Sequence, residues 1–171
     1  MAEDGRKFTS FYVTSGVCSP SCSSLVTGCY PKRVSLHQKE KGRGVLFPDN
    51  QRGLNPSEIT IAEVLKARGY VTGIVGKWHL GDQPEFLPTR QGFDSYFGIP
   101  FSNDMGHKDR PTKLYPPLPL LRMEKVIEEE PDQQLITQRY TREAIAFIVR
   151  NKARPFFLYL PMTSPHTPLS V

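Results

Sequence analysis

The spacing of apolar residues predicts three regular elements along the chain. Apolar side chains recur at intervals of three and four over Gln133–Lys152, which predicts an amphipathic helix. Runs rich in β-branched and aromatic residues over Tyr70–Gly76 and Phe156–Leu160 predict two buried strands. Helices that alternate with strands in this way predict an α/β fold with a largely parallel sheet. The sequence shows no internal repeat, and we expect one domain over residues 1–171.

Weaker patterns predict two short elements near the N-terminus. Aromatic and polar residues alternate over Phe8–Val13, which predicts a short strand. A short helix is expected over residues 21–27, because Pro20 suits a first helical turn, where its missing N–H would have no partner. Gly28 is placed to end that helix.

The connections between the predicted elements are long. Residues 31–57 are rich in Lys, Arg, Gly, Pro and Asn, and we expect a surface connection there. Asn55–Glu58 has residues typical of a helix start, and the pattern after it predicts a helix that ends at Gly69. Residues 82–122 contain many prolines and glycines without sustained periodicity, which predicts a functional or partly disordered loop.

Composition narrows the class of protein. Hydrophobic residues make up 38% of the chain and charged residues 23%, a balance typical of globular proteins. The net charge of +5 permits anionic partners, but the basic residues are scattered and match no nucleic-acid-binding motif, so nucleic-acid binding is not expected. No apolar run approaches the roughly 20 residues that a membrane span needs. The segment Met1–Lys7 is polar and predicts no signal peptide.

The cysteines Cys18, Cys22 and Cys29 lie close together in the sequence. Their odd number and clustering do not match a secreted disulfide framework. Zinc sites usually use pairs of ligands two to four residues apart together with a fourth ligand, which this spacing does not supply. A metal cluster and a role as small buried residues both remain open readings of the three thiols.

Candidate chemistry follows the predicted strands and opens the predicted helix. Cys18 precedes a helix whose unpaired N–H groups favour an anionic group such as sulfate or phosphate. Lys77 and His79 follow the strand over Tyr70–Gly76, two positions apart, and would offer a fixed charge beside a proton carrier. His166 follows the last strand between two prolines, which favour an extended backbone. A lone histidine after a strand is more often a hydrogen-bonded structural residue than a catalyst, and this reading applies to each of the two taken alone.

Four segments together resemble the sulfatase family, close to its arylsulfatase branch. The resemblance covers nearly the whole chain and rests on the motifs at Cys18–Gly28, Gly69–Gly81, Pro88–Asp104 and Pro155–Pro168. It implies an α/β sandwich like that of alkaline phosphatase. It also implies hydrolysis of sulfate esters with a bound calcium ion and a formylglycine made by oxidation of the cysteine.

The resemblance assigns a role to each candidate residue. Cys18 would become formylglycine, attack sulfur as its hydrate, and contribute to the calcium site. Lys77 would hold a sulfate oxygen, and His79 would take a proton from the second hydroxyl so that sulfate is expelled. His166 would contact the sulfate and assist the leaving alcohol, and Ser102 would line the pocket near the nucleophile.

The family also implies partners and a compartment. The substrate would be a small sulfate ester, a sulfated glycan or a sulfated lipid. A formylglycine-generating enzyme would modify Cys18. The family suggests an exported, periplasmic or lysosomal location, and the chain itself does not indicate which compartment it occupies.

The sequence departs from the family at two kinds of position. Cys22 stands where the family has an arginine, and a thiol offers neither the charge nor the five donors of that side chain. The aspartate pairs that bind calcium in the family have no match here, so we expect a sheet incomplete at both ends and impaired activity. A non-catalytic relic with weak anion binding, a phosphatase relative and an unrelated anion-binding module are the alternatives.

Overall fold

The computed structural model describes residues 3–37, 44–48, 50–107 and 115–169. In this part of the chain the strands form a five-stranded sheet with the order β4-β3-β2-β1-β5. The helices and strands, in chain order, are α1 (Cys18–Thr27), α2 (Ile61–Lys66), β1 (Val71–Val75), β2 (Ser95–Gly98), β3 (Pro119–Arg122), β4 (Lys125–Glu129), α3 (Gln133–Asn151) and β5 (Phe156–Tyr159). Short 3₁₀ turns span Pro84–Phe86, Pro88–Arg90 and Asn103–Met105.

The sheet is parallel in its middle and antiparallel toward one edge. Strand β1 pairs in parallel with both β2 and β5, whereas β2 with β3 and β3 with β4 pair antiparallel. The parallel centre therefore places the carboxyl ends of β1, β2 and β5 at the same edge of the sheet. Ligands of open α/β sheets collect at such an edge.

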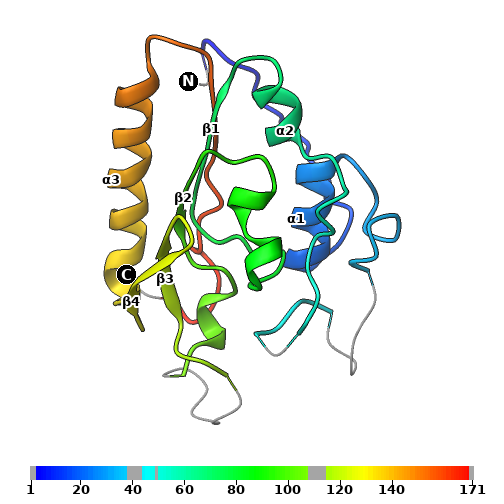
Figure 1. The fold of residues 1–171 in the computed structure, drawn as a ribbon, viewed down its shortest axis with the longest axis vertical. Helices are drawn as coiled ribbons and strands as arrows, with labels where there is room; N and C mark the ends of the chain where they lie inside the picture. The colour runs from blue at the N-terminus through cyan, green and yellow to red at the C-terminus, as the bar shows by residue number, and fades with distance from the viewer. Residues whose placement is uncertain (1–2, 38–43, 49, 108–114, 170–171) are drawn as a thin grey trace.

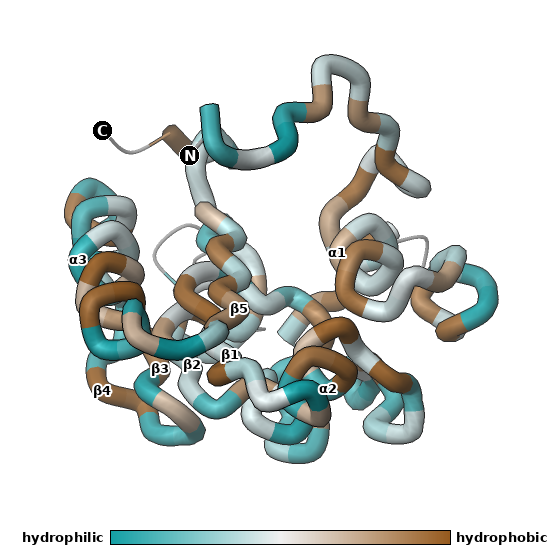
Figure 2. The backbone as a smooth tube through the Cα atoms, turned by 90° about the horizontal axis from the view of Figure 1, so that it is seen from above, coloured by the Kyte–Doolittle hydropathy of each residue, from teal (hydrophilic) through white to brown (hydrophobic). Residues whose placement is uncertain are grey.

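Helices cover both faces of the sheet. Figures 1 and 2 show α3 on one side, with α1 and α2 on the other. Helix α3 packs closely over β1, because a Cβ at Gly73 would lie only 2.4 Å from the ring of Phe147. Trp78 and Tyr96 lie in the core beneath α1 and α2, and Phe97 and Tyr140 lie in the core beneath α3.

The strongest sequence patterns are confirmed. The helix predicted over Gln133–Lys152 is α3, and the strands predicted over Tyr70–Gly76 and Phe156–Leu160 are β1 and β5. Strand β5 is half-buried rather than fully buried, because among the described strands it pairs only with β1. The α/β fold with a parallel centre is therefore as predicted.

The predictions near the N-terminus are partly confirmed. Helix α1 includes Pro20 and begins earlier than predicted, at Cys18, and Gly28 ends it in the left-handed conformation at φ 68°. The strand predicted over Phe8–Val13 is wrong. This segment has no regular structure, and the Tyr12 side chain is 90% exposed. A short alternating segment is not stable as a strand without a neighbouring strand to pair with.

Two further predictions are wrong. Helix α2 starts not at Asn55–Glu58 but at Ile61, where Thr60 and Glu63 form a capping box. Asn55 instead closes a turn, because its carbonyl accepts a hydrogen bond from the Glu58 N–H at 2.9 Å. The predicted loop over residues 82–122 contains β2 and β3, which are defined by pairing with distant strands and not by local periodicity.

Candidate active site

The end of β1 continues into a well-supported loop. The Lys77 N–H donates a hydrogen bond to the Pro161 carbonyl at 2.9 Å, and the Trp78 N–H donates one to the Ile99 carbonyl at 3.0 Å. The residues after β1 are thus held between the segments that follow β2 and β5. Lys77 and His79 lie at this edge of the sheet, at 7% and 1% exposed.

A glycine makes this close approach possible. Gly76 has φ 134°, and a Cβ there would lie 2.1 Å from the Pro161 carbonyl oxygen. Only a residue without a side chain fits between the two backbones in this conformation. Gly76 therefore allows the chain after β5 to approach the residues that precede Lys77 and His79.

The ring of His79 is held in one orientation by a backbone carbonyl. Its Nε2 lies 2.9 Å from the Leu46 carbonyl oxygen, and because a carbonyl only accepts, Nε2 carries the proton and donates. In the neutral ring Nδ1 then bears a lone pair. This buried atom has no hydrogen-bond partner among the described residues. His79 also has a backbone φ of 57°, a conformation uncommon for a residue other than glycine.

The surroundings of His79 keep its imidazole uncharged. Burial lowers the pKa of His79 from its ordinary value of 6.5 to about 4, and the nearby charge of Lys77 acts in the same direction. The Leu46 carbonyl and Asp104 oppose this shift, and His166 adds to it slightly. At neutral pH His79 is therefore a neutral base with a free Nδ1.

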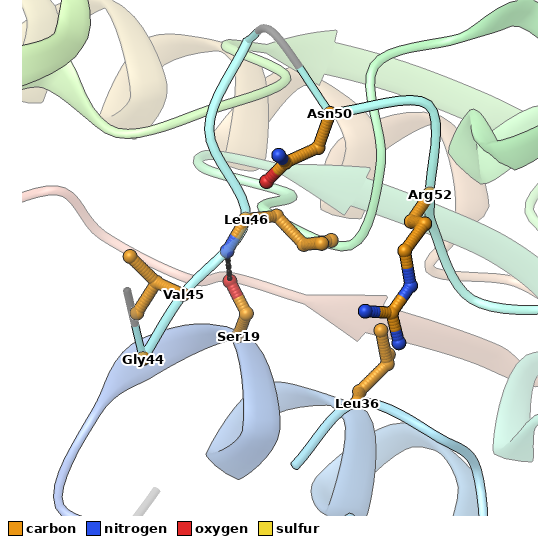
Figure 3. A pocket seen from close by; sticks show the side chains of 7 residues that line it. All are labelled: Ser19, Leu36, Gly44, Val45, Leu46, Asn50 and Arg52. Atoms are coloured by element: carbon orange, nitrogen blue, oxygen red, sulfur yellow. Dashed lines mark hydrogen bonds between the residues drawn. The ribbon is translucent and has the colours of Figure 1, made fainter. Parts of the chain in front are cut away.

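The first turn of α1 is connected to His79 through the peptide of Leu46. The Leu46 N–H donates a hydrogen bond to the Ser19 hydroxyl at 3.1 Å, as Figure 3 shows, and the Leu46 carbonyl accepts from His79. Cys18 is the residue before Ser19 and is half-buried. The Leu46 peptide thus connects the helix that begins at Cys18 with the histidine at the end of β1.

Cys22 occupies the position one helical turn after Cys18. Burial raises the pKa of Cys22, a hydrogen bond with the Tyr159 hydroxyl opposes that shift, and Cys18 and Lys77 lie near enough to contribute. Cys22 also packs against the core beneath α1 and α2. At this position the protein therefore has a neutral thiol, where the resemblance to sulfatases implies a guanidinium.

His166 lies in a turn after β5, not in the extended segment predicted between the two prolines. The His166 N–H donates to the Thr163 carbonyl at 3.0 Å, which closes the turn. Its ring Nδ1 lies 2.6 Å from the Thr167 carbonyl oxygen, so Nδ1 is the donor and Nε2 bears the lone pair in the neutral ring. The extended prediction failed because this backbone hydrogen bond bends the chain.

Polar groups that the sequence patterns did not single out lie beside His166. Asn103 and Thr163 are buried, and with His166 they line a small cavity of about 10 Å³, roughly enough to admit one water molecule. Asn103 Oδ1, Thr163 Oγ1 and the buried Ser102 Oγ have no hydrogen-bond partner among the described residues. Asn103 falls within the motif Pro88–Asp104, but no sequence pattern marked it or Thr163 as part of the site.

Lys77, Ser102 and His166 follow the carboxyl ends of β1, β2 and β5, and Cys18 begins α1 on one side of the sheet. Cys18 and Lys77 both lie close enough to Cys22 to affect its pKa, and Lys77 and His166 both affect that of His79. Ser102 lies on the neighbouring loop after β2, where its carbonyl accepts a hydrogen bond from the Met105 N–H at 3.0 Å. The arrangement combines a thiol at a helix start, a lysine and two histidines.

The described residues do not fit a calcium site. Within residues 3–37, 44–48, 50–107 and 115–169, His, Cys, Asp and Glu side chains do not gather in groups of three or more that could hold a metal ion. Calcium takes six to eight oxygen ligands, several of them usually carboxylates, and the described part of the chain has no such cluster of carboxylates. The described helices also include none with the length and apolarity needed to cross a membrane.

Known proteins are similar to this chain over its whole length. Arylsulfatase G of Mus musculus is 36% identical over 196 aligned residues, which cover 100% of this chain and 36% of that protein. Arylsulfatase A of Homo sapiens is 39% identical over 185 residues, which cover 98% of this chain and 36% of that protein. The chain therefore spans about a third of the length of the curated relatives it matches.

Solved structures agree with these sequence matches. The crystal structure of Ps i-CgsB in complex with k-i-k-neocarrahexaose has a TM-score of 0.74 and 31% identity, over 94% of this chain and 37% of that one. These structural neighbours of the chain confirm the predicted alkaline-phosphatase-like fold. The family model described as Sulfatase matches residues 1–171, the same span that contains the Cys18, Lys77, His79 and His166 segments, and so the chain belongs to the sulfatase family.

Proposed function

We propose that the whole protein hydrolyses sulfate esters and that Cys18 is its nucleophilic position after oxidation to formylglycine. The observation that carries this proposal is the state of His79, a buried neutral imidazole with a free Nδ1 beside Lys77. A base of this kind next to a fixed positive charge suits proton transfer in the hydrolysis of an anionic ester.

Each residue has a distinct part in this proposal. The aldehyde at position 18 supplies, as its hydrate, the oxygen that attacks sulfur. The Lys77 ammonium binds the sulfate oxygens and offsets the charge that develops on them. His79 Nδ1 accepts a proton while Leu46 holds the ring. His166 can donate from Nε2, when protonated, to the alcohol that leaves, while Nδ1 stays bonded to Thr167.

A sulfated glycan is the substrate class that the comparisons favour within this proposal. The similar protein Ps i-CgsB was crystallised with k-i-k-neocarrahexaose, and N-acetylgalactosamine-6-sulfatase of Canis lupus familiaris is 37% identical to this chain. A small sulfate ester or a sulfated lipid would offer the same sulfate group to Lys77 and His79. These three classes therefore share one chemistry at the reacting centre.

Cys22 supports a second candidate function, a non-catalytic chain with at most weak anion binding. Its thiol is buried against Tyr159 and stays neutral, so it gives no charge to a sulfate. Loss of one preorganised charged donor costs on the order of 10²–10³ in rate. We accordingly propose that cysteine in place of arginine at position 22 lowers the rate of turnover.

The first test is the chemical state of Cys18. The protein is produced together with a formylglycine-generating enzyme, and the tryptic peptide Phe8–Lys32 is examined by mass spectrometry and by labelling with an aldehyde-specific reagent. We expect an aldehyde that is absent from Cys18→Ala and retained in Cys29→Ala. A thiol at position 18 in both the natural chain and Cys22→Arg would overturn the proposal.

The second test separates the two candidate functions. Hydrolysis of an aryl sulfate is compared between the natural chain and Cys22→Arg, with Cys29→Arg as the matched control. A gain of about 10²–10³ in Cys22→Arg alone supports the catalytic function with a lesion at this position. Absence of turnover in both variants, with the aldehyde present, supports the non-catalytic alternative.

A further inference from the structure

Two thiols lie on one face of α1, one helical turn apart. Cys18 is the first residue of the helix and Cys22 follows four positions later. Four residues of an α-helix span about 6 Å between Cα atoms, which lies within the roughly 4.4–6.8 Å typical of disulfides. The charge of Cys18 helps to raise the pKa of Cys22, so the two side chains lie within electrostatic range of one another.

We propose that Cys18 and Cys22 form a reversible disulfide that blocks the nucleophilic position of this protein. Their Cβ atoms, at about 5–6 Å on a regular helix, must approach by roughly 1–2 Å to reach the spacing of a disulfide. Cys18 can make this movement because it opens the helix, and its N-cap residue Val17 provides no side-chain hydrogen bond. Cys22 stays fixed by its contact with Tyr159.

Cys29 is not a partner for either thiol. It lies beyond Gly28 at the far end of α1, and its N–H donates to the Thr27 hydroxyl at 3.2 Å. Thr27, the last helical residue, lies about 14 Å along the helix axis from Cys18 and about 8 Å from Cys22, both more than the roughly 7 Å between Cα atoms that a disulfide allows, and Cys29 lies beyond Thr27. The fold therefore selects one pair among the three cysteines.

The reaction needs a disulfide oxidant such as glutathione disulfide. The half-buried Cys18 loses its proton and attacks one sulfur of the oxidant, and one glutathione thiolate leaves. Burial raises the pKa of Cys22, so Cys22 is the poorer first nucleophile and acts in the second step. The Cys22 thiolate then attacks the Cys18 sulfur of the mixed disulfide, and the second glutathione leaves. Two thiols are oxidised and one glutathione disulfide is reduced to two glutathiones.

The disulfide and the formylglycine are alternative fates of the same sulfur. A bridged Cys18 has no free thiol for the modifying enzyme, so oxidising conditions would prevent activation. This consequence rests on the proposed function, whereas formation of the disulfide does not. An arginine at position 22 could not close the bridge, and the substitution by Cys22 is what gives this chain the second thiol.

The test uses the full chain, produced without a formylglycine-generating enzyme, reduced and then exposed to glutathione disulfide. We expect the peptide Phe8–Lys32 to become lighter by two hydrogen atoms and to regain them on addition of dithiothreitol. Cys29→Ser should behave like the natural chain. With Cys29 also replaced by Ser in each case, Cys22→Ser should stop at a single glutathione adduct on Cys18, and Cys18→Ser should form no bridge.

The outcomes distinguish this inference from the proposed function. A persistent glutathione adduct in the natural chain, no reaction, or loss of the bridge in Cys29→Ser would each overturn it. The natural chain unfolded in urea serves as a control for folding, because it should form several pairings where the folded chain forms one. The readout is a mass and not a turnover, so a chain that hydrolyses no sulfate ester would still be expected to close the bridge.

Discussion

The two histidines of the candidate site are held in opposite ways. His79 is buried, and it donates from Nε2 to the carbonyl of Leu46, which is 33 positions earlier in the chain. His166 is half-buried, and it donates from Nδ1 to the carbonyl of Thr167, its own neighbour. Long-range packing therefore fixes the first ring, and a local turn fixes the second.

This difference determines what each histidine can do. The pKa of about 4 at His79 comes mainly from burial, so its environment maintains a neutral base with a lone pair on Nδ1. His166 has its lone pair on Nε2 and is only half-buried. The comparison shows that one residue type, at the ends of two adjacent strands, can be placed in two different environments, and that burial together with the charge of Lys77 keeps the first of them neutral.

The largest expected effect comes from removing each ring. In protein that carries the aldehyde, His79→Ala and His166→Ala should each lower the turnover of an aryl sulfate by about 10²–10⁴. Urea unfolding should separate them, because His79→Ala empties a buried site and loses about 3 kcal/mol, whereas His166→Ala loses under about 1 kcal/mol.

The variant His79→Gln shows whether His79 takes part in the chemistry or only supports the loop. The glutamine in His79→Gln keeps a donor for the Leu46 carbonyl but has no basic nitrogen. Compared with His79→Ala, this variant should therefore regain stability without regaining turnover. Recovery of both would mean that His79 only supports the loop, and the contrast between the two rings would lose its chemical meaning.

The second largest effect is expected where the end of β1, which leads to His79, contacts the segment after β5, which leads to His166. In Gly76→Ala, the new Cβ would meet the Pro161 carbonyl at 2.1 Å in a conformation with φ 134°. Strain and overpacking cost about 1–3 kcal/mol each, so the free energy of unfolding should fall by about 4 kcal/mol in urea titration. Gly16→Ala is the matched control, because nothing lies within 4 Å of a Cβ there. Equal stability of the two variants would show that β1 and the segment after β5 can separate freely.

The sequence predicted the His79 region better than the contacts that fix it. Strand periodicity and the motif after it placed Lys77 and His79 at a strand end, and the structure agrees with that strand. The bond to Leu46 could not be predicted, because it links two segments with no pairing pattern between them. Asn103 and Thr163 were missed for the same reason, since burial of a loop polar group depends on tertiary packing.

The strands of the sheet also show that the sequence predicts elements with local patterns better than elements that depend on tertiary contacts. Parallel β1 and β5 have apolar runs of their own, whereas β2 and β3 lie in a segment rich in proline and glycine. Strand β2 is stabilised by pairing with β1, and β3 by pairing with β4. A local sequence pattern does not reveal such pairing between separate segments. Phe8–Val13 is the converse case, a strand-like pattern that remains irregular without a partner.

The third prediction concerns pH and uses the low pKa of His79. Its folded pKa of about 4 lies below the ordinary value of 6.5, so the unfolded chain binds the proton more tightly. Stability should therefore be fully present above pH 6.5 and fall as the pH decreases toward 4. Between pH 7 and pH 4.5 the natural chain should lose about 2 kcal/mol more than His79→Gln in urea titration.

Carboxylates do not account for this window. The pKa values of Asp94 and Glu143 are lowered, by their bonds to Lys66 and Thr72 and to Arg122 respectively, although burial opposes the shift in both. Their stabilisation is lost only as the pH falls below their unfolded values of 3.8 and 4.5. Identical pH dependence in the natural chain and His79→Gln would show that His79 is not kept neutral by the fold.

The smallest expected effect tests the connection between α1 and His79. Ser19→Ala removes the hydroxyl that accepts from the Leu46 N–H, and loss of one such bond costs about 1 kcal/mol. Ser21→Ala is the control on the same helix, because Ser21 faces Phe11 and Leu25 instead. NMR titration of the His79 ring should then show a pKa closer to its ordinary value in Ser19→Ala, since a released Leu46 segment admits water to the ring. An unchanged His79 titration with a normal loss of stability would mean that Ser19 supports the loop without influencing the histidine, and the two regions would then be independent.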